Sequence, residues 1–300
     1  MKQRILTLHQ MYQEGKSRLE ASGVLDADLD AWYLLEYVTG KTKAEYYGNP
    51  KEEMGEEIIS RYEKAVDERA RRIPLQHITG EQEFMGFPFR VNEHVLIPRQ
   101  DTELLVEEAL KILEPEMKIL DLCTGSGCIL LSLMKMGEEK GIRGLTGTGA
   151  DISREALEVA EENGKCLKIP AERVRWIESD LFGQVNGAFD LLVSNPPYIP
   201  TEEIEELQDE VRLHDPRIAL DGHDDGLYFY RGIAGESGAY LEDGAWVLLE
   251  IGWDQGEAVR ELLEDAGYQD VEVKKDLAGN DRVVRGRYRK QRALEKAALR

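Results

Sequence analysis

The sequence has few of the features that mark secreted, membrane-spanning or metal-binding proteins. Its 300 residues include three cysteines, Cys123, Cys128 and Cys166. An odd number does not fit a disulfide framework, and no second Cys pair or His cluster lies near Cys123 and Cys128. No apolar run reaches the roughly 18 residues of a membrane span, and the first residues lack the apolar core of a signal peptide. The sequence therefore predicts a cytoplasmic protein without a structural metal.

Positive charge is also scarce. Lys and Arg number 38 against 59 Asp and Glu, so the formal net charge is −21. Such a chain repels phosphate backbones, which disfavours broad, sequence-independent binding to nucleic acid. The exception is the segment 282–300, with eight Lys or Arg residues and one Glu. We expect it to form a solvated C-terminal helix, and contact with an acidic partner or ribosomal RNA is the weaker alternative.

What the sequence does contain suggests a small helical domain followed by a larger one. Residues 1–72 show helical patterns throughout. They include a helix capped by Asp28 and ended by Gly40, and a charged helix from about Lys51 to Arg72. We expect four segments: a helical substrate-recognition domain at 1–75, a linker with a β-hairpin within 83–98 at 76–100, a catalytic domain at 101–290, and a basic tail at 291–300.

From about Thr102 onward, short apolar runs alternate with amphipathic helices. This alternation predicts an α/β fold with a doubly wound, mostly parallel sheet that ends in an antiparallel hairpin. The seven expected strands are 118–122, 145–150, 173–177, 189–194, 245–251, 271–275 and 282–288.

The first three of these runs end in residues suited to holding a nucleotide-like ligand. The first leads into DLCTGSGC, where Gly125 and Gly127 permit positive φ and close approach of the backbone to a ligand. A dinucleotide fingerprint would need a third glycine where Leu130 stands, which disfavours a nicotinamide dehydrogenase. Asp151 ends the second run, placed to accept hydrogen bonds from ribose hydroxyls. Asp180 and Leu181 follow the third run, placed to contact the edge and the face of an adenine.

The fourth run ends in Asn195-Pro196-Pro197-Tyr198, which suits the binding of a planar amide. The nitrogen of an amide is a poor nucleophile because its lone pair is delocalised into the carbonyl. The Asn195 side-chain oxygen and the Pro196 carbonyl can accept both N–H groups of a planar –NH2, which directs it, and Tyr198 can pack on its face. The alternative interpretation is purely structural, because Asn and Pro are also common where a strand ends in a loop. The preceding nucleotide-type strand ends favour the catalytic interpretation.

Together these motifs resemble the HemK/PrmC-type protein-glutamine methyltransferases, which modify the glutamine of the Gly-Gly-Gln motif in peptide chain release factors. Asn-Pro-Pro-Tyr alone also occurs in amino-methyltransferases of nucleic acid, whereas VLIPRQDTE is far more specific. The resemblance spans about residues 18–288. It is carried by ASGVLDADLDAWYLLEYVTG, RRIPLQHITGEQEFMGFPFRVNEHVLIPRQDTELLVEEAL, DLCTGSGCI, SDLF, SNPPYIP and DLAGNDRVV.

The resemblance implies a Rossmann-like methyltransferase domain, S-adenosylmethionine as cofactor, S-adenosylhomocysteine as product and release factors as partners. The chain departs from the family pattern at Cys123, where glycine is common, and at Asp215, where glutamate is usual. The implied cofactor-binding residues are Cys123, Thr124, Gly125, Ser126, Gly127, Asp151, Asp180, Leu181 and Asn195. The implied catalytic and substrate-binding residues are Asn195, Pro196, Pro197 and Tyr198.

Three other functions remain as alternatives. A glutamine methyltransferase for a ribosomal protein would share every motif of the site. A nucleic-acid amino-methyltransferase is disfavoured by the net charge of −21. A non-catalytic binding module would not need the intact glycines and Asn195–Tyr198.

Overall fold

The computed structural model describes residues 4–291 and 293, and its contacts divide the chain into two compact units. Unit 1 comprises Met1–Glu81 and Gln208–His214, and unit 2 comprises Gln82–Leu207 and Asp215–Arg300. The four-segment division expected from the sequence stays a prediction. Its basic tail, 291–300, lies almost entirely outside the described residues. Among the described residues, no helix is long and apolar enough to cross a membrane.

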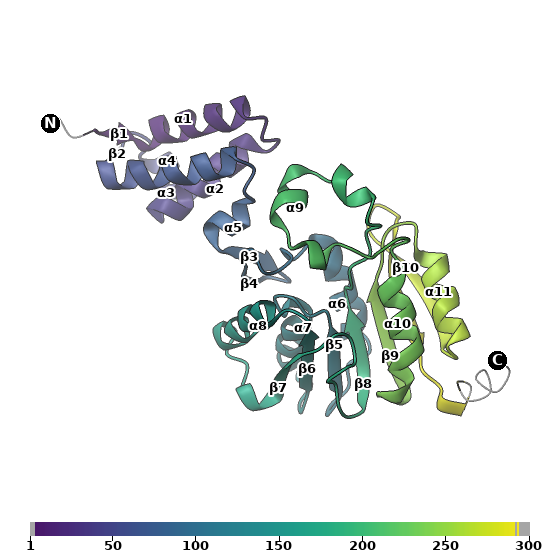
Figure 1. The fold of residues 1–300 in the computed structure, drawn as a ribbon. Helices are drawn as coiled ribbons and strands as arrows, with labels where there is room; N and C mark the ends of the chain where they lie inside the picture. Colours follow the sequence, from purple (N-terminus) through teal and green to yellow (C-terminus); the bar gives the residue numbers. More distant parts are fainter. Residues whose placement is uncertain (1–3, 292, 294–300) are drawn as a thin grey trace. The chain divides into compact units, whose positions relative to one another are not determined.

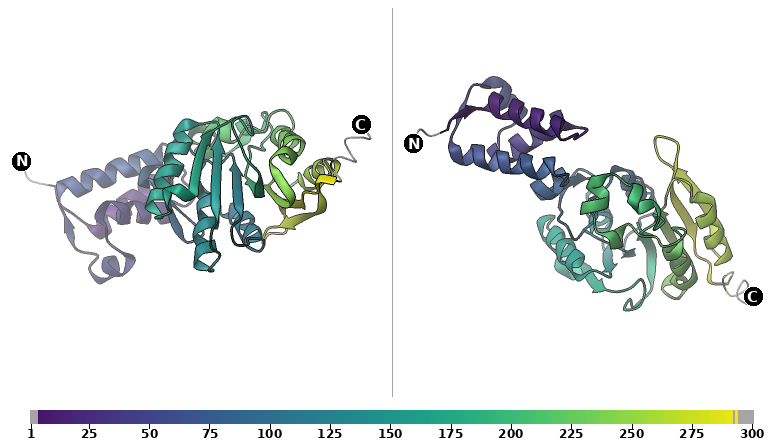
Figure 2. Two further views of the ribbon diagram at one scale, coloured as in Figure 1. Left: turned by 90° about the horizontal axis from the view of Figure 1, so that it is seen from below. Right: turned by 45° about the horizontal axis from the view of Figure 1, so that its top comes forward.

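Unit 1 is a small helical bundle in which three longer helices pack on one another (Figures 1 and 2). Side chains of Thr7 and Thr42 cap α1 and α3 in reciprocal capping boxes with Gln10 and Glu45. The helices are α1 (Leu8–Ala21), α2 (Ala27–Thr39), α3 (Lys43–Gly48), α4 (Glu56–Ala70), α5 (Leu75–Thr79) and α9 (Asp209–His214), and the short strands β1 (Leu6–Thr7) and β2 (Glu53–Met54) pair antiparallel.

Two local expectations for unit 1 are wrong. Asp28 does not cap α2. It lies inside the first turn, and its carboxylate accepts hydrogen bonds from Tyr12 (2.7 Å) and Lys16 (2.5 Å). The charged helix begins at Glu56, because Glu53 and Met54 pair with β1 instead of continuing a helix. The expected stop at Gly40 is confirmed, with φ of 68° in the left-handed region.

A buried ion pair holds α2 to α4 in unit 1. Arg69 on α4 is 8% exposed, and its Nε donates to the Asp30 carboxylate on α2 at 2.7 Å. Burial raises the pKa of Asp30, and the guanidinium opposes that rise. Arg69 and Arg72 both donate to Glu210 of α9, at 3.1 and 2.9 Å. The same arginine therefore binds a segment that joins unit 1 from far along the chain.

Unit 2 is built on a seven-stranded sheet in the order β10-β11-β9-β8-β5-β6-β7 (Figure 1). All pairs are parallel except those of β11 with β9 and β10. The doubly wound sheet and terminal hairpin expected from the sequence are confirmed. The strands are β5 (Lys118–Leu122), β6 (Thr146–Asp151), β7 (Val174–Glu178), β8 (Phe189–Ser194), β9 (Leu241–Glu250), β10 (Gln269–Lys275) and β11 (Asp281–Arg287).

Alternating side chains of the strands feed two apolar cores, one on each face of the sheet. On β5, Ile119 belongs to the first core and Leu120 to the second. Helices α6 (Glu103–Leu110) and α7 (Cys128–Glu139) contribute to the first core, while α8 (Arg154–Cys166) packs on β6 and β7 and forms a small separate cluster with Val91 and Val95. Helices α10 (Tyr228–Glu236) and α11 (Gly256–Asp265) cover the second. Short 3-10 turns complete the unit: η1 (Gln100–Thr102), η2 (Ala171–Arg173), η3 (Glu203–Glu206), η4 (Arg217–Ala219) and η5 (Ser237–Ala239).

The expected hairpin is present as β3 (Glu81–Phe84) and β4 (Phe87–Arg90), so it begins two residues before the expected range 83–98 and ends well within it. Met85 and Gly86 form its turn, both with positive φ, as a two-residue hairpin turn requires. Phe84 and Phe89 are buried in the first core and meet edge to face at 6.0 Å. The hairpin is thus fixed to unit 2 by aromatic packing.

Replacing Arg69 by Met should destabilise unit 1 strongly, because the Asp30 carboxylate would remain buried without a partner. We expect a loss of about 3–5 kcal/mol, measured as faster amide hydrogen exchange across α2 and α4 in the full-length protein. Arg18→Met is the matched control: Arg18 pairs with Asp67 at an exposed site, and its loss should cost under about 1 kcal/mol. Equal effects of the two substitutions would contradict this account.

Candidate active site

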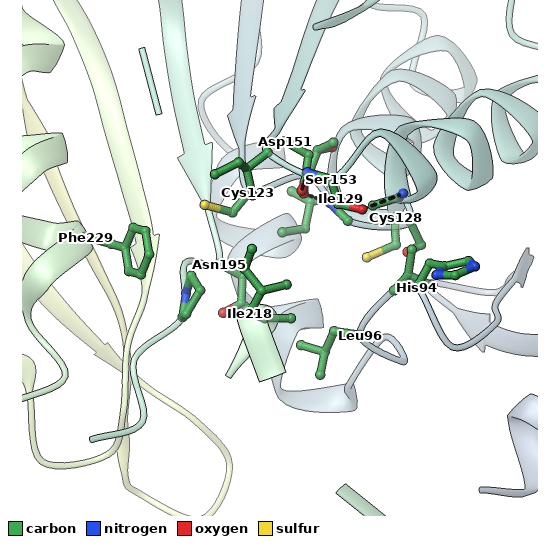
Figure 3. Close-up of a pocket in the computed structure, with 18 of the residues that line it drawn as sticks. His94, Leu96, Cys123, Cys128, Ile129, Asp151, Ser153, Asn195, Ile218 and Phe229 are labelled. Carbon is green, nitrogen blue, oxygen red and sulfur yellow. Dashed lines mark hydrogen bonds between the residues drawn. The ribbon is translucent and has the colours of Figure 1, made fainter. Parts of the chain in front are cut away.

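A cavity of about 340 Å³ opens at the carboxyl ends of the central strands of unit 2. The order of the strands reverses between β5 and β8, which is where open α/β sheets bind their ligands. Figure 3 shows Cys123, Asp151 and Asn195 around this cavity. The expected site residues that line it are Cys123, Thr124, Gly125, Ser126, Asp151, Asp180, Leu181, Asn195 and Pro197.

In the loop between β5 and α7, every second residue has a left-handed backbone conformation. Cys123, Gly125 and Gly127 have φ of 56°, 53° and 77°. A Cβ on Gly127 would lie 3.0 Å from Trp176 and 3.1 Å from Ala160, whereas nothing lies within 4 Å of a Cβ on Gly125. Gly127 therefore serves packing, and Gly125 opens onto the cavity.

A buried carboxylate on β5 anchors this loop through the Thr124 side chain. Asp121, on β5, is fully buried, and its Oδ2 accepts the Thr124 hydroxyl at 2.6 Å. Burial raises the pKa of this carboxyl group to about 7, and the Thr124 hydroxyl and the backbone N–H of Leu130 oppose that rise. Sequence reasoning missed Asp121 because it falls inside an apolar strand run.

Asp151 joins the glycine loop to the start of α8. Its Oδ2 accepts the N–H of Gly125 at 2.8 Å, and its Oδ1 accepts the N–H of Ser153 at 3.0 Å. Burial raises the pKa of this carboxyl group and these backbone donors oppose the rise. The backbone N–H of Ile152 also opposes that rise, and a carboxylate with about four acceptor sites still has capacity for a further donor. The Ser153 side chain accepts the N–H of Ala156 at 3.1 Å, so its expected role as helix cap is confirmed.

The loop after β7 places Asp180 and Leu181 on the cavity wall. Leu181 has φ of 43°, and the Ser179 hydroxyl donates to its carbonyl at 2.8 Å. The same hydroxyl oxygen accepts the N–H of Gln184 at 2.9 Å. Ser179 thereby fixes the turn that directs both residues to the site.

The Asn-Pro-Pro-Tyr loop contributes Asn195 and Pro197 to the cavity. Asn195 Nδ2 donates to Thr102 Oγ1 at 3.3 Å. Pro196 is buried, and Tyr198 packs against the second core while its carbonyl accepts Gln255 Nε2 at 3.0 Å. Gly127, Pro196 and Tyr198 thus belong to the loops of the site but are not among the cavity-lining residues, and their proposed roles stay predictions.

Aromatic side chains from a segment that sequence reasoning did not assign also line the cavity. His223, Tyr228 and Phe229 pack on one another, with ring centroids 4.2 to 5.8 Å apart. In Figure 3, Phe229 and His94 lie on opposite sides of the site. No motif marks these residues, because they reach the site only through the long connection after β8.

The linker motif VLIPRQDTE meets distant parts of unit 2. Arg99 pairs with the buried Asp215, so the shorter side chain at that position still reaches a partner. Asp101 pairs with Arg282 at 3.1 Å. Thr102 binds Asn195, as above. The sequence motifs IPRQDT, Asn-Pro-Pro-Tyr and Asn-Asp-Arg therefore converge on one place, which their separation along the chain does not reveal.

Two family models match the chain: the PrmC N-terminal domain over residues 10–80 and the methyltransferase small domain over residues 100–211. The release factor glutamine methyltransferase of Caulobacter vibrioides is 42% identical over 284 residues, covering 94% of this chain and 96% of that protein. That of Moorella thermoacetica is 41% identical, covering 92% and 97%. The chain belongs to the release factor glutamine methyltransferase family. It is an α/β methyltransferase, as the resemblance implied.

Solved structures include one relative with a similar name. It is the protein-(glutamine-N5) methyltransferase (release factor-specific) of Alicyclobacillus acidocaldarius, 32% identical to this chain. The match covers 67% of this chain and 99% of that chain, with a TM-score of 0.38. The assignment to the family rests on the full-length sequence relatives.

The cavity fits the nucleoside cofactor that methyltransferases use. Open space at Gly125 leaves room for a ligand against the backbone. The remaining acceptor capacity of the Asp151 carboxylate suits a ribose hydroxyl, and the apolar Leu181 and Ile152 suit an adenine face. This donor set would hold S-adenosylmethionine.

The two loop glycines should respond differently to alanine. Gly127→Ala should destabilise unit 2 by about 1–3 kcal/mol, because three side chains crowd the new Cβ. Gly125→Ala carries only the strain of positive φ, about 1–2 kcal/mol. It should instead weaken S-adenosylhomocysteine binding by about tenfold or more. Thermal unfolding and calorimetry measure the two effects, and an unchanged affinity in Gly125→Ala would remove that residue from the pocket.

Cys123 is expected to act structurally. Burial raises the pKa of its thiol, which disfavours the nucleophilic thiolate. Cys123→Gly should keep turnover, since glycine suits φ of 56°. Cys123→Val should lower stability by about 1–2 kcal/mol, because a branched Cβ is strained there. Loss of methyl transfer in a folded Cys123→Gly variant would show that the thiol itself is needed.

Proposed function

We propose that this protein transfers a methyl group from S-adenosylmethionine to the side-chain nitrogen of a glutamine in a peptide chain release factor, within the Gly-Gly-Gln motif. The observation that carries the proposal is the position of Asn195. It lines the cavity while its amino group donates to Thr102. Its carbonyl oxygen is thereby left to accept an N–H from a substrate amide.

Amide chemistry explains why such an acceptor is required. When bound, S-adenosylmethionine supplies an electrophilic methyl group on a sulfonium. Asn195 and the Pro196 carbonyl would each accept one N–H of the glutamine amide, which fixes the plane of the –NH2 group and raises electron density on nitrogen. Fixing a reactant in this way supplies about 7–11 kcal/mol in favourable cases. The apolar and aromatic walls of the cavity would exclude water.

The rival substrates differ in where the methyl group arrives. A ribosomal-protein glutamine would be methylated by the same residues, and a nucleobase amine would need a surface that tolerates phosphate. The formal net charge of −21 disfavours the nucleobase. The proposed protein substrate also agrees with the names of the relatives that align over nearly the whole chain.

The test is to incubate the protein with labelled S-adenosylmethionine and a purified release factor, and to locate the label by mass spectrometry. Asn195→Ala should cut turnover by at least about 10²-fold, because one oriented acceptor is lost. Affinity for S-adenosylhomocysteine should fall less than turnover, since Asn195 acts chiefly in the transition state.

A release factor in which the motif glutamine is replaced by glutamate is the matched substrate control. It should not be methylated at that position, because no nitrogen remains to attack. A methyl group found on a glutamate, a backbone amide or a nucleobase would overturn the proposal, as would faster methylation of a ribosomal protein.

A further inference from the structure

Glu250 is a buried carboxylate directly behind Asn195. It is the last residue of β9 and is 2% exposed. Strand β9 pairs in parallel with β8, with Leu249 opposite Ser194, so the next residues, Glu250 and Asn195, are neighbours across the sheet. Glu250 is not among the residues that line the cavity. The proposed methyl transfer gives it no direct contact with a substrate.

Glu250 forms a small polar group with Thr102 and Asn195. The side chains of both residues interact with its carboxyl group and oppose the rise of its pKa, and its Oε2 is buried without a hydrogen-bond partner among the described residues. Asn195 Nδ2 also donates to Thr102 Oγ1 at 3.3 Å. Thr102 and Glu250 are each 2% exposed, and Thr102 and Asn195 line the cavity in front of Glu250.

The ionised form of Glu250 decides which end of the Asn195 amide faces inward. Thr102 Oγ1 accepts from Asn195 Nδ2, so its hydroxyl hydrogen is left for the unpartnered oxygen of Glu250, and an ionised carboxylate can only accept it. Both inner neighbours of Asn195 are therefore acceptors. They require its –NH2 group, and the carbonyl oxygen is turned toward the cavity. The two ends of an amide have nearly the same shape, so the hydrogen-bond partners determine this choice.

We propose that Glu250 is a positioning residue that, through Thr102, holds the Asn195 carbonyl toward the substrate amide. The inference rests on the proposed function, because it concerns how Asn195 receives the glutamine. A protonated or amide side chain at position 250 can donate to the Asn195 oxygen. The flipped Asn195 would then present N–H to the N–H of the substrate, and the amide could not bind productively.

The charges around Glu250 make its protonation relevant near neutral pH. Burial raises the pKa of Glu250 to about 7, opposed by Arg282 and reinforced by Asp101. The ionisable groups that face it are Asp101 on η1, Cys128 on α7, Tyr198 after β8, Tyr230 on α10 and Arg282 on β11. Turnover of the wild-type protein should therefore fall as the pH drops below about 7.

Glu250→Gln is the first variant, because it keeps the shape and removes the charge. At pH 8 it should lower kcat by about 10²-fold, with a much smaller effect on S-adenosylhomocysteine binding. The remaining activity of this variant should no longer fall as the pH drops below about 7. Glu108→Gln is the matched control: Glu108 is also buried, paired with Lys111 and Arg285, and its replacement should keep both kcat and this fall in activity at low pH.

Stability separates positioning from a merely structural role. Between the pKa of an unfolded glutamate and about 7, the folded protein retains a proton that the unfolded chain has released, so ionisation of Glu250 lowers stability as the pH rises. Glu250→Gln should therefore melt at the same or a higher temperature than wild type at pH 8. Loss of activity together with a lower melting temperature, and an unchanged pH profile, would overturn the proposal.

A double variant gives the sharpest test. Asn195→Asp places a second carboxylate beside Glu250, and combining it with Glu250→Gln lets the glutamine donate to one oxygen of the aspartate. The other oxygen stays free as an acceptor, so the double variant should exceed the activity expected from the two single losses by at least about tenfold. Independent losses would overturn the inference. If wild type itself methylates no glutamine in the same assay, the proposed function fails instead, and the inference with it.

Discussion

The register of the parallel strands is the constraint on which the site depends. Leu122 of β5 lies opposite Ala150 of β6 and Ser194 of β8, and Ser194 lies opposite Leu249 of β9. The residues that follow are Cys123, Asp151, Asn195 and Glu250. Backbone hydrogen bonding thus places a loop start, a carboxylate, an amide and a second carboxylate in one row at the edge of the sheet. A shift of one residue would break that row.

Buried polar groups then fix the side chains of this row. Asp121 anchors Thr124, Asp151 holds the N–H of Gly125, and Thr102 accepts from Asn195 beside the buried Glu250. Burying carboxylates costs free energy, as the raised pKa values of Asp121 and Glu250, each about 7, indicate. Groups that cost stability yet define hydrogen-bond direction are typical of sites where orientation matters more than stability.

The long connection between β8 and β9 contributes residues to both units. The connection after β8 supplies α9 to unit 1 and the aromatic residues Tyr228 and Phe229 to the cavity of unit 2. In unit 1, Glu210 binds Arg69, which also neutralises the buried Asp30. The connection between β8 and β9 therefore contributes to an ion-pair network in unit 1 and to the cavity lining in unit 2, because its two parts belong to different units.

The sheet, the glycine loop and the Asn-Pro-Pro-Tyr loop follow from the sequence alone. Strand periodicity, turn chemistry and strand-end residues are local properties, so all seven strands and Ser153 as a cap were predicted correctly. The starts of α2 and α4 were not, because partners from other elements engage Asp28 and pair with Glu53 and Met54. The meeting of Thr102, Asn195 and Glu250, and the placing of Tyr228 and Phe229 on the cavity wall, depend instead on the folded chain. Residues this far apart in the chain are brought together by strand register and packing, which leave no local pattern in the sequence.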